Sequence, residues 1–177
     1  MSTKQMLLSG FGGQGILFAG KFLAYKGLTA GKQVSWLPSY GPEMRGGTAS
    51  CSVIISDDAV GSPIISNPDI LVAMNLPSLD KFEKNVVSGG IILADSTLIE
   101  RKVERDDVTV YYVPATRLAS ENGFPTLANM ILMGKLLAVL GEFDADGLNS
   151  TLAKVIPPKR AEMLETNLKA LKLGAEF

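Results

Sequence analysis

The fold is decided by the stretch Ser9-Gly10-Phe11-Gly12-Gly13-Gln14-Gly15. An apolar run, Met6-Leu7-Leu8, precedes it, and a segment of periodic apolar residues over 16–28 follows it. This order predicts a strand, a tight turn and a helix, and the glycines have the spacing G-x-G-x-x-G. Glycines leave backbone N–H groups uncovered, and the start of a helix attracts an anion or a carbonyl oxygen. The turn is therefore a candidate binding site, formed by Gly10, Gly12, Gly13, Gln14 and Gly15.

A complete dinucleotide site also needs an acidic residue at the end of the second strand, where it holds a ribose. The second predicted strand covers 32–37 and ends in Pro38-Ser39, without a carboxylate. The turn therefore has an alternative role, in which it only lets the helix pack closely on the sheet. The spacing by itself leaves both roles open.

Length and composition predict one globular domain over residues 1–177, with neither repeats nor a linker. Hydrophobic residues make up 46% of the chain and charged residues 20%. This apolar tendency is typical of a parallel sheet covered on both faces, or of a surface buried against another chain. The net charge of −1 gives no basic surface for nucleic acid. No apolar run has the length of a membrane span and no signal peptide is apparent, so we expect a cytoplasmic protein.

The content of cysteine and histidine excludes several kinds of site within this chain. Cys51 is the only cysteine, and there is no histidine. One thiolate cannot hold an iron–sulfur cluster or a zinc ion, each of which needs about four ligands. Nucleophilic catalysis by a Ser-His or Cys-His pair is excluded as well. Any redox chemistry must therefore come from a bound organic cofactor or from another subunit.

The order of the predicted elements indicates an α/β protein with three layers, α/β/α. Its sheet is mixed but mostly parallel, its first βα unit is Rossmann-like, and its C-terminal third is helical. Too few residues precede the strand at 48–56 for a helical crossover, which favours an antiparallel strand. Strands are predicted at 5–9, 32–37, 48–56, 69–74, 90–94 and 108–113, with a short edge strand at Ile64-Ile65. Helices are predicted at 14–30, 77–85, 114–120 and 125–140, followed by a helix capped by Asp144 or Asp146 and a final helix from Pro157-Pro158.

Three polar residues have two possible roles each. Asn75 and Asp95 follow predicted strands, at the edge where open α/β sheets bind ligands. Both side chains are also typical of turns and helix caps. Asn129 is the one amide within the predicted helix at 125–140, where we expect it to be a packing residue with its hydrogen bonds satisfied.

A second glycine-bracketed loop, Ser39-Tyr40-Gly41-Pro42-Glu43-Met44-Arg45-Gly46-Gly47, completes the set of motifs. Together with the glycine turn it resembles the gamma subunit of the 2-oxoacid:ferredoxin oxidoreductases, the family that acts on pyruvate, 2-oxoglutarate or 2-ketoisovalerate. The similarity continues through Asn75-Leu76-Pro77, the helix with Asn129 and Asn167-Leu168-Lys169-Ala170, and so covers essentially the whole chain.

The resemblance implies a non-catalytic subunit of a larger enzyme. Members of the family decarboxylate a 2-oxoacid on thiamine diphosphate and Mg²⁺, pass electrons through iron–sulfur clusters to ferredoxin, and form an acyl-coenzyme A. The resemblance places these cofactors with alpha, beta and delta subunits. This chain agrees, because it lacks both the cysteines of a cluster and the G-D-G…N-N signature of thiamine sites. No catalytic residue and no metal ligand is expected in it.

The chemistry of the second loop is compatible with such a role. Arg45 has a planar fork that suits a phosphate or a carboxylate, and Gly46 and Gly47 let another chain approach. Tyr40 offers an aromatic face, and Glu43 is able to fix Arg45. We therefore expect Ser39, Tyr40, Glu43, Arg45, Gly46 and Gly47 to contact coenzyme A or another subunit. The alternative is an internal Glu43–Arg45 pair that only shapes the loop.

Two other classes of function stay open at this level. One is a free-standing reductase that binds a flavin or NAD at the glycine turn. The other is an interaction domain without a ligand.

Overall fold

A computed structural model describes residues 2–39 and 48–177 of the chain. In these ranges six strands form one sheet with the order β2-β3-β1-β4-β5-β6. β1, β4, β5 and β6 are parallel, whereas β3 is antiparallel to both β1 and β2. The mixed, mostly parallel sheet and the antiparallel strand at 48–56 are thereby confirmed. The strands are β1 (Thr3–Phe11), β2 (Gln33–Ser39), β3 (Thr48–Ser56), β4 (Ile70–Ala73), β5 (Ile91–Asp95) and β6 (Thr109–Val113).

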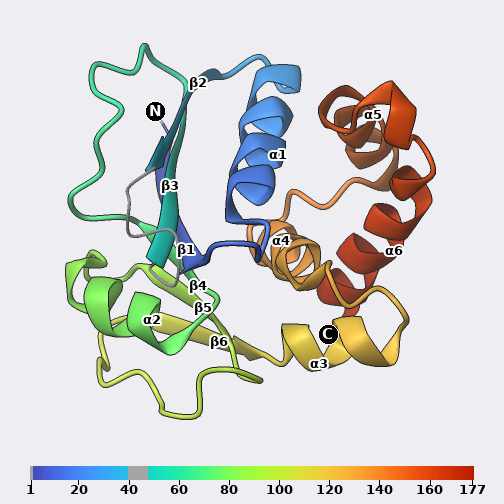
Figure 1. The fold of residues 1–177 in the computed structure, drawn as a ribbon. Coiled ribbons are helices and arrows are strands. Elements are labelled where there is room, and N and C mark those ends of the chain that lie inside the picture. The colour runs from blue at the N-terminus through green and yellow to red at the C-terminus, as the bar shows by residue number, and fades with distance from the viewer. Residues whose placement is uncertain (1, 40–47) are drawn as a thin grey trace.

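Helices cover both faces of the sheet, so the predicted three layers are present (Figure 1). α1 and the C-terminal helices lie on one face, and α2 lies on the other. The helices are α1 (Ile16–Thr29), α2 (Leu76–Phe82), α3 (Ala115–Glu121), α4 (Ala128–Val139), α5 (Ala145–Val155) and α6 (Met163–Glu176), with single 3-10 turns at Glu83–Asn85 and Pro158–Arg160.

Alternating side chains of the strands enter two apolar cores. Leu8 and Val72 face α1 and α4, whereas Leu7 and Leu71 face α2. This alternation follows from the two-residue period of a strand, and it makes the central strands apolar on both faces. The apolar composition is explained in part by this double coverage.

The C-terminal helices pack unusually closely, with glycines at the crossing of α4 and α6. A Cβ atom built on Gly134 would lie 1.9 Å from the backbone oxygen of Leu171. One on Gly174 would lie 1.8 Å from the backbone oxygen of Ile131. α4 is buried almost all round, because β5, α1, α3 and α6 surround it. It therefore forms the centre of the helical third.

Three predicted elements differ from the structure. Ile64 and Ile65 form no strand: Pro63 and Pro68 flank them and lack N–H donors, and the side chain of Ile64 is 69% exposed. The helix expected from Pro125 begins only at Ala128, because Phe124 and Leu127 close a turn before it. The final helix begins at Met163 rather than at Pro157, since Pro158–Arg160 forms a separate 3-10 turn.

Two other expectations about the helices can be compared with the structure. Asp144 is the predicted cap: its Oδ2 accepts a hydrogen bond from the N–H of Gly147, 3.1 Å away, at the start of α5. Within the described ranges, none of the helices has the length and apolar character needed to cross a membrane.

Candidate functional site

Those predicted site residues that the structure describes lie at the carboxyl edge of the sheet. β1 and β2 point the same way, because each is antiparallel to β3. Ser9, Ser50 and Ser39 stand side by side across these three strands, and Phe11 pairs with Thr48. The glycine turn after β1 therefore lies at the same edge as Ser39 and Thr48, the residues that flank 40–47. β4, β5 and β6 also end there, so that Asn75 and Asp95 belong to the same edge.

Gln14 holds the glycine turn in shape. Its Oε1 accepts a hydrogen bond from the N–H of Phe11, at 2.6 Å, and its Nε2 donates to the backbone oxygen of Met74, at 3.2 Å. A Cβ atom on Gly10 would lie only 2.6 Å from Oε1 of Gln14. Gly10 therefore has to be glycine for this side chain to cross from the turn to the end of β4.

The turn passes into α1 at Gly15, which has a positive φ of 74°. The Nδ2 of Asn129 donates a hydrogen bond to the backbone oxygen of Gly15, at 3.0 Å. A Cβ atom on Gly15 would lie 2.4 Å from that nitrogen. The positive φ and the close approach of the Asn129 side chain each require glycine at position 15. Gly12 and Gly13 are exposed, and a Cβ atom on Gly13 would meet nothing within 4 Å. This part of the turn leaves room for another molecule.

Asn75 and Asp95 have the cap and turn contacts that their residue types indicate. Oδ1 of Asn75 accepts from the N–H of Ser78 at 2.8 Å and caps α2. Asp95 accepts from Oγ1 of Thr116 at 2.6 Å and from the N–H of Thr97 at 3.1 Å, and so joins the end of β5 to the start of α3. The Nδ2 of Asn75 is buried and has no partner among the described residues. Its role in ligand contact stays a prediction.

The second loop is described only at its ends. Ser39 is exposed at the end of β2, and β3 begins at Thr48. Tyr40, Glu43, Arg45, Gly46 and Gly47 lie outside the described residues. Thr48 pairs with Phe11 of β1, whereas Ser39 pairs with Ser50 of β3 and lies one strand further from β1, at the same edge of the sheet as the glycine turn.

The chain's one thiol is structural. Cys51 is buried under α1, and a Cβ atom on Gly20 would lie 2.3 Å from its sulfur. Burial raises the pKa of the Cys51 thiol to about 12, which keeps it protonated and unreactive. Across residues 2–39 and 48–177, no cluster of three or more acidic, cysteine or histidine residues is arranged to hold a metal ion.

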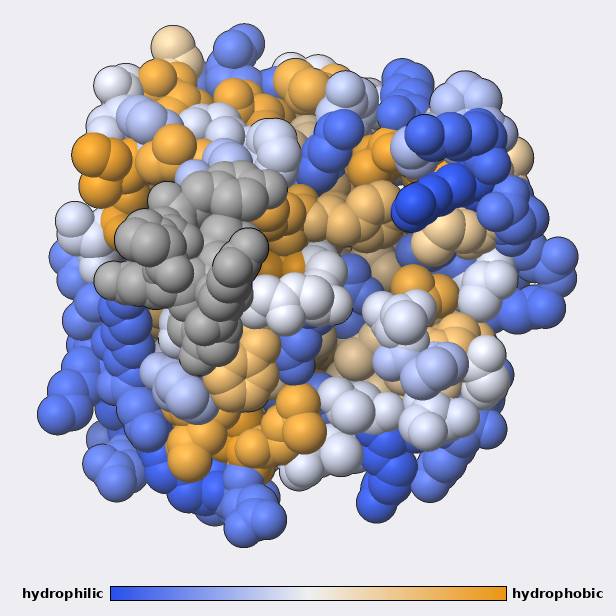
Figure 2. All heavy atoms as spheres, viewed as in Figure 1, coloured by the Kyte–Doolittle hydropathy of each residue, from blue (hydrophilic) through white to orange (hydrophobic). Residues whose placement is uncertain are grey.

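Large apolar side chains are exposed near the same edge. Phe11, at the end of β1, is 41% exposed, and Leu37, on the outermost strand β2, is 40% exposed. Figure 2 shows several apolar areas on this face of the molecule. An edge strand with exposed apolar side chains is typical of a surface that pairs with another chain.

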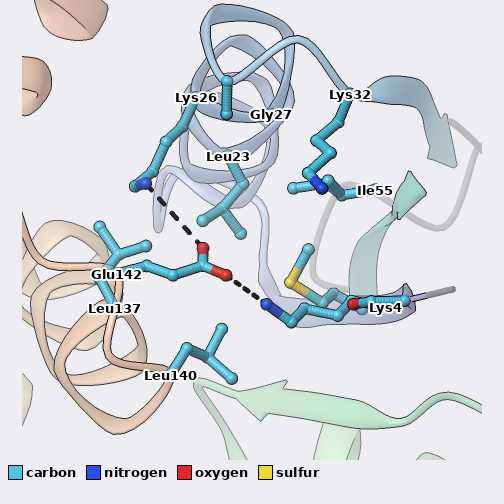
Figure 3. Close-up of a pocket in the computed structure, with 12 residues that line it drawn as sticks. Lys4, Leu23, Lys26, Gly27, Lys32, Ile55, Leu137, Leu140 and Glu142 are labelled. Carbon is cyan, nitrogen blue, oxygen red and sulfur yellow. Dashed lines mark hydrogen bonds and ion pairs between the residues drawn. The ribbon is translucent and has the colours of Figure 1, made fainter. Parts of the chain in front are cut away.

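Two cavities adjoin α1. One, of about 380 Å³, opens between α1, the start of β1 and the residues after α4. Glu142 projects between Lys4 and Lys26 and forms an ion pair with each of them (Figure 3). Lys32, also at this cavity, pairs with Asp57. The second cavity, of about 400 Å³, lies between α1, the start of α4 and the α5–α6 connection.

The sequence did not identify the second cavity as a site. It is lined by Asn129, which was expected to have all its hydrogen bonds satisfied. Nδ2 of Asn129 is bonded, but its Oδ1 has no partner among the described residues, so that expectation is wrong for one of its two polar atoms. The only sequence signal was the one amide in a mostly apolar helix.

The arrangement of turn, sheet and helices can now be compared with known proteins. Residues 5–177 match the family described as pyruvate ferredoxin/flavodoxin oxidoreductase. The chain belongs to this family. The resemblance to the 2-oxoacid oxidoreductases, which rested on the two glycine-bracketed motifs, is thereby confirmed.

Individual members of the pyruvate ferredoxin/flavodoxin oxidoreductase family resemble the chain over nearly its whole length. Ketoisovalerate oxidoreductase subunit VorA of Methanothermobacter thermautotrophicus is 41% identical over 171 residues, which cover 96% of this chain and 35% of VorA. The chain thus spans about a third of the length of that relative. 2-Oxoglutarate synthase subunit KorC of Methanocaldococcus jannaschii is 37% identical over 176 residues, which cover 98% of this chain and 92% of KorC.

A solved structure in the same family has the same fold. The gamma subunit of a keto/oxoacid ferredoxin oxidoreductase from Geobacter sulfurreducens superimposes with a TM-score of 0.82 at 28% sequence identity. The match covers 98% of this chain and 96% of that subunit. The predicted α/β fold class is confirmed by this similarity.

Proposed function

We propose that this chain is the gamma subunit of a 2-oxoacid:ferredoxin oxidoreductase, which oxidatively decarboxylates a 2-oxoacid to an acyl-coenzyme A. The observation that carries the proposal is the match of almost the whole chain to a separate gamma subunit and to the KorC subunit. These matches favour a subunit over a free-standing flavin or NAD reductase. The cytoplasmic location expected from the sequence is part of the proposal.

In this proposal the chain supports the reaction without carrying it out. Thiamine diphosphate, Mg²⁺ and the iron–sulfur clusters are held by alpha, beta and delta subunits, and ferredoxin accepts the electrons. The residue types present here agree with that division, because the single thiol is buried and protonated and the chain contains no histidine. No residue of this chain is assigned a chemical step.

The carboxyl edge is the part of the chain that we propose to contact coenzyme A or a neighbouring subunit. The glycine turn presents exposed backbone at Gly12 and Gly13, next to the start of α1. Asn75 adds a buried amide nitrogen that has no partner among residues 2–39 and 48–177, and Arg45 belongs to the segment between Ser39 and Thr48, which both lie at this edge. Backbone N–H groups, an amide and a guanidinium together suit a phosphate or a carboxylate.

The subunit assignment is tested by reconstitution with the partner chains. The complete enzyme should reduce a viologen dye when both a 2-oxoacid and coenzyme A are supplied. The isolated chain should not, because it has no group that stabilises a carbanion or accepts its electrons. Dye reduction by this chain alone, or full activity of the complex without it, would contradict the assignment.

The role of the carboxyl edge is tested separately with Arg45→Ala, and Lys154→Ala on the exposed surface of α5 is the control. Losing a charge-assisted contact in a buried interface should cost about 2–5 kcal/mol of binding free energy. Failure of the variant to assemble indicates a subunit contact, whereas normal assembly with a raised KM for coenzyme A indicates a ligand contact. Unchanged assembly and turnover together with a lower melting temperature would contradict both.

A further inference from the structure

The cavity beside Glu142 has charged side chains around an apolar floor (Figure 3). Its volume of about 380 Å³ lies in the range of small-molecule sites. Leu23, Ile55 and Leu140 approach its centre from α1, from β3 and from the end of α4. Ile55 and Leu140 are only partly buried, so a bound molecule would remove apolar surface of this chain from water.

Three lysine side chains line the same cavity and are reached by solvent. Lys4 comes from β1, Lys26 from α1 and Lys32 from the position before β2, and their side chains are 30%, 20% and 41% exposed. An ammonium group has three N–H donors. Within residues 2–39 and 48–177, Lys4 and Lys32 each donate one hydrogen bond to a carboxylate, and Lys26 donates none through its ammonium. Donors therefore remain for the acid group of a bound molecule.

Glu142 already holds a carboxylate between two of these lysines. It forms an ion pair with Lys4, and its Oε2 lies 3.9 Å from the Nζ of Lys26. The side chain of Glu142 is 36% exposed, and ion pairs that water reaches contribute little stability. A second carboxylate can therefore compete with Glu142 for the lysines.

The charges at this cavity do not cancel among the described residues. Lys4 and Lys26 share Glu142, and Lys32 pairs with Asp57. Three ammonium groups thus face two carboxylates, which leaves one positive charge. A ligand with one negative charge would balance it, whereas a ligand with two would exceed it. The electrostatics therefore favour a monoanion.

We propose that this cavity binds a short-chain aliphatic monocarboxylate. Lys26, together with Lys4, binds the acid group, and the hydrocarbon chain covers Ile55 and Leu140. The cavity adjoins the C-terminal end of α1 and the start of β1, whereas the glycine turn joins the other ends of these two elements. The site is therefore separate from the carboxyl edge and goes beyond the subunit assignment.

The proposal is tested by titrating the full chain with hexanoate in a calorimeter. Saturable binding to one site is expected. Hexanamide, which lacks the charge, and acetate, which lacks the hydrocarbon chain, should each bind at least tenfold more weakly. The absence of saturable binding, or equal affinity for either analogue, would overturn the proposal.

The chain length of the ligand is tested with dodecanoate, kept below the concentration at which it forms micelles. Affinity within threefold of hexanoate, or weaker, supports a free short acid, because the cavity then ends before the longer chain does. Binding more than threefold tighter would overturn the short-chain assignment, since the longer hydrocarbon chain of a lipid would then be the better fit.

Lysine substitutions locate the binding in this cavity. Lys26→Gln should weaken hexanoate about tenfold, because it removes the ammonium group that has the fewest partners. Lys21→Gln is the matched control: it removes the same charge from the same helix, but Lys21 lines the other cavity, with Arg160. Its affinity should stay within twofold of the wild-type chain. Equal losses in Lys26→Gln and Lys21→Gln would overturn the assignment to the Glu142 cavity.

Glu142→Gln should bind hexanoate at least threefold more tightly than the wild-type chain, because it removes the competing carboxylate from Lys4 and Lys26. Glu121→Gln is the control: it removes an exposed carboxylate that pairs with Arg117 and does not line the cavity, so affinity should stay within twofold. Melting temperatures of both variants are measured alongside, and Lys26→Gln tests the site independently if Glu142→Gln is less stable. Equal or weaker binding by a folded Glu142→Gln chain would overturn the proposal.

Discussion

Gln14 shows how one side chain shapes the glycine turn. It spans from the N–H of Phe11 to the backbone oxygen of Met74, which is 60 residues away in the chain. Both contacts use backbone groups, so the side chain replaces hydrogen bonds that the tight turn cannot form by itself. The sequence singled out Gln14 as a binding residue, and the structure adds this supporting role.

We expect Gln14→Met to lower the free energy of unfolding by about 1–2 kcal/mol, because methionine has a similar shape but cannot form either hydrogen bond. Urea denaturation followed by circular dichroism measures the change. Gln33→Met, at an exposed position of β2, is the control and should change stability by less than about 0.5 kcal/mol. An unfolding midpoint of Gln14→Met equal to that of the control would contradict the supporting role.

The buried thiol of Cys51 predicts how its reactivity and the stability of the fold change with pH. Burial raises the pKa of its thiol from 9.0 to about 12, so at pH 9 only about a thousandth of the native protein carries a thiolate. Native protein should therefore react with an aromatic disulfide reagent at least a hundredfold more slowly than protein in urea.

The same pKa shift makes the stability of the fold depend on pH. Because the pKa of the thiol is higher in the folded than in the unfolded chain, its contribution to the unfolding free energy is complete below pH 9 and is lost as the pH rises toward 12. Labelling of native protein within seconds at pH 8.5 would exclude a buried thiol.

The crossing of α4 and α6 depends on two glycines that let the helix backbones approach each other. Gly174→Ala would place a Cβ atom against the backbone oxygen of Ile131, where a side-chain rotation cannot relieve the contact. We expect a loss of about 2–3 kcal/mol in unfolding free energy, although alanine favours a helix over glycine by about 1 kcal/mol. Thermal and urea denaturation measure it, and limited proteolysis should cleave near α6 first.

Gly61→Ala is the matched control for this helix crossing. A Cβ atom on Gly61 would meet nothing within 4 Å, so its stability should stay close to that of the wild-type chain. A wild-type melting temperature for Gly174→Ala would show that α6 packs further from α4 than the structure has it.

At the scale of the whole molecule, the position of β3 separates the glycine turn from the end of β2. In a dinucleotide-binding domain these two strands are neighbours, and a carboxylate at the end of the second one holds the ribose. Here β3 lies between them, so the end of β2 is two strand spacings away, roughly 9.5 Å. β2 also carries no carboxylate. The ribose of an NAD bound at the glycine turn would therefore have no carboxylate to bind it, and the end of β2 would lie too far away to supply one.

We therefore expect the chain to bind NAD with a dissociation constant above about 1 mM, because only the anion-attracting start of α1 is available to the pyrophosphate. Calorimetric titration of the isolated chain with NAD measures this. Inorganic phosphate is the control and should bind with similar weakness. A micromolar dissociation constant for NAD would favour the free-standing reductase instead.

The sequence alone determined the glycine turn, the antiparallel β3 and the order of the elements apart from the strand expected at Ile64-Ile65. These features depend on local periodicity, glycine spacing and the length of connections, all of which can be read along the chain. The family came instead from the resemblance of the two glycine-bracketed motifs to those of known proteins. The helix starts predicted at Pro125 and Pro157 were wrong, because proline is compatible both with a first helical turn and with the turn that precedes it.

Only the tertiary structure decided which groups from distant segments meet. Gly15 and Asn129 are 114 residues apart and are joined by a hydrogen bond, and Lys21 and Arg160 come to one cavity from opposite ends of the chain. Apolar periodicity indicates which face of a helix is buried, but it does not name the element that covers that face. Nor does it indicate whether a buried amide has both of its polar atoms satisfied, since this depends on the partners that packing brings within about 3 Å.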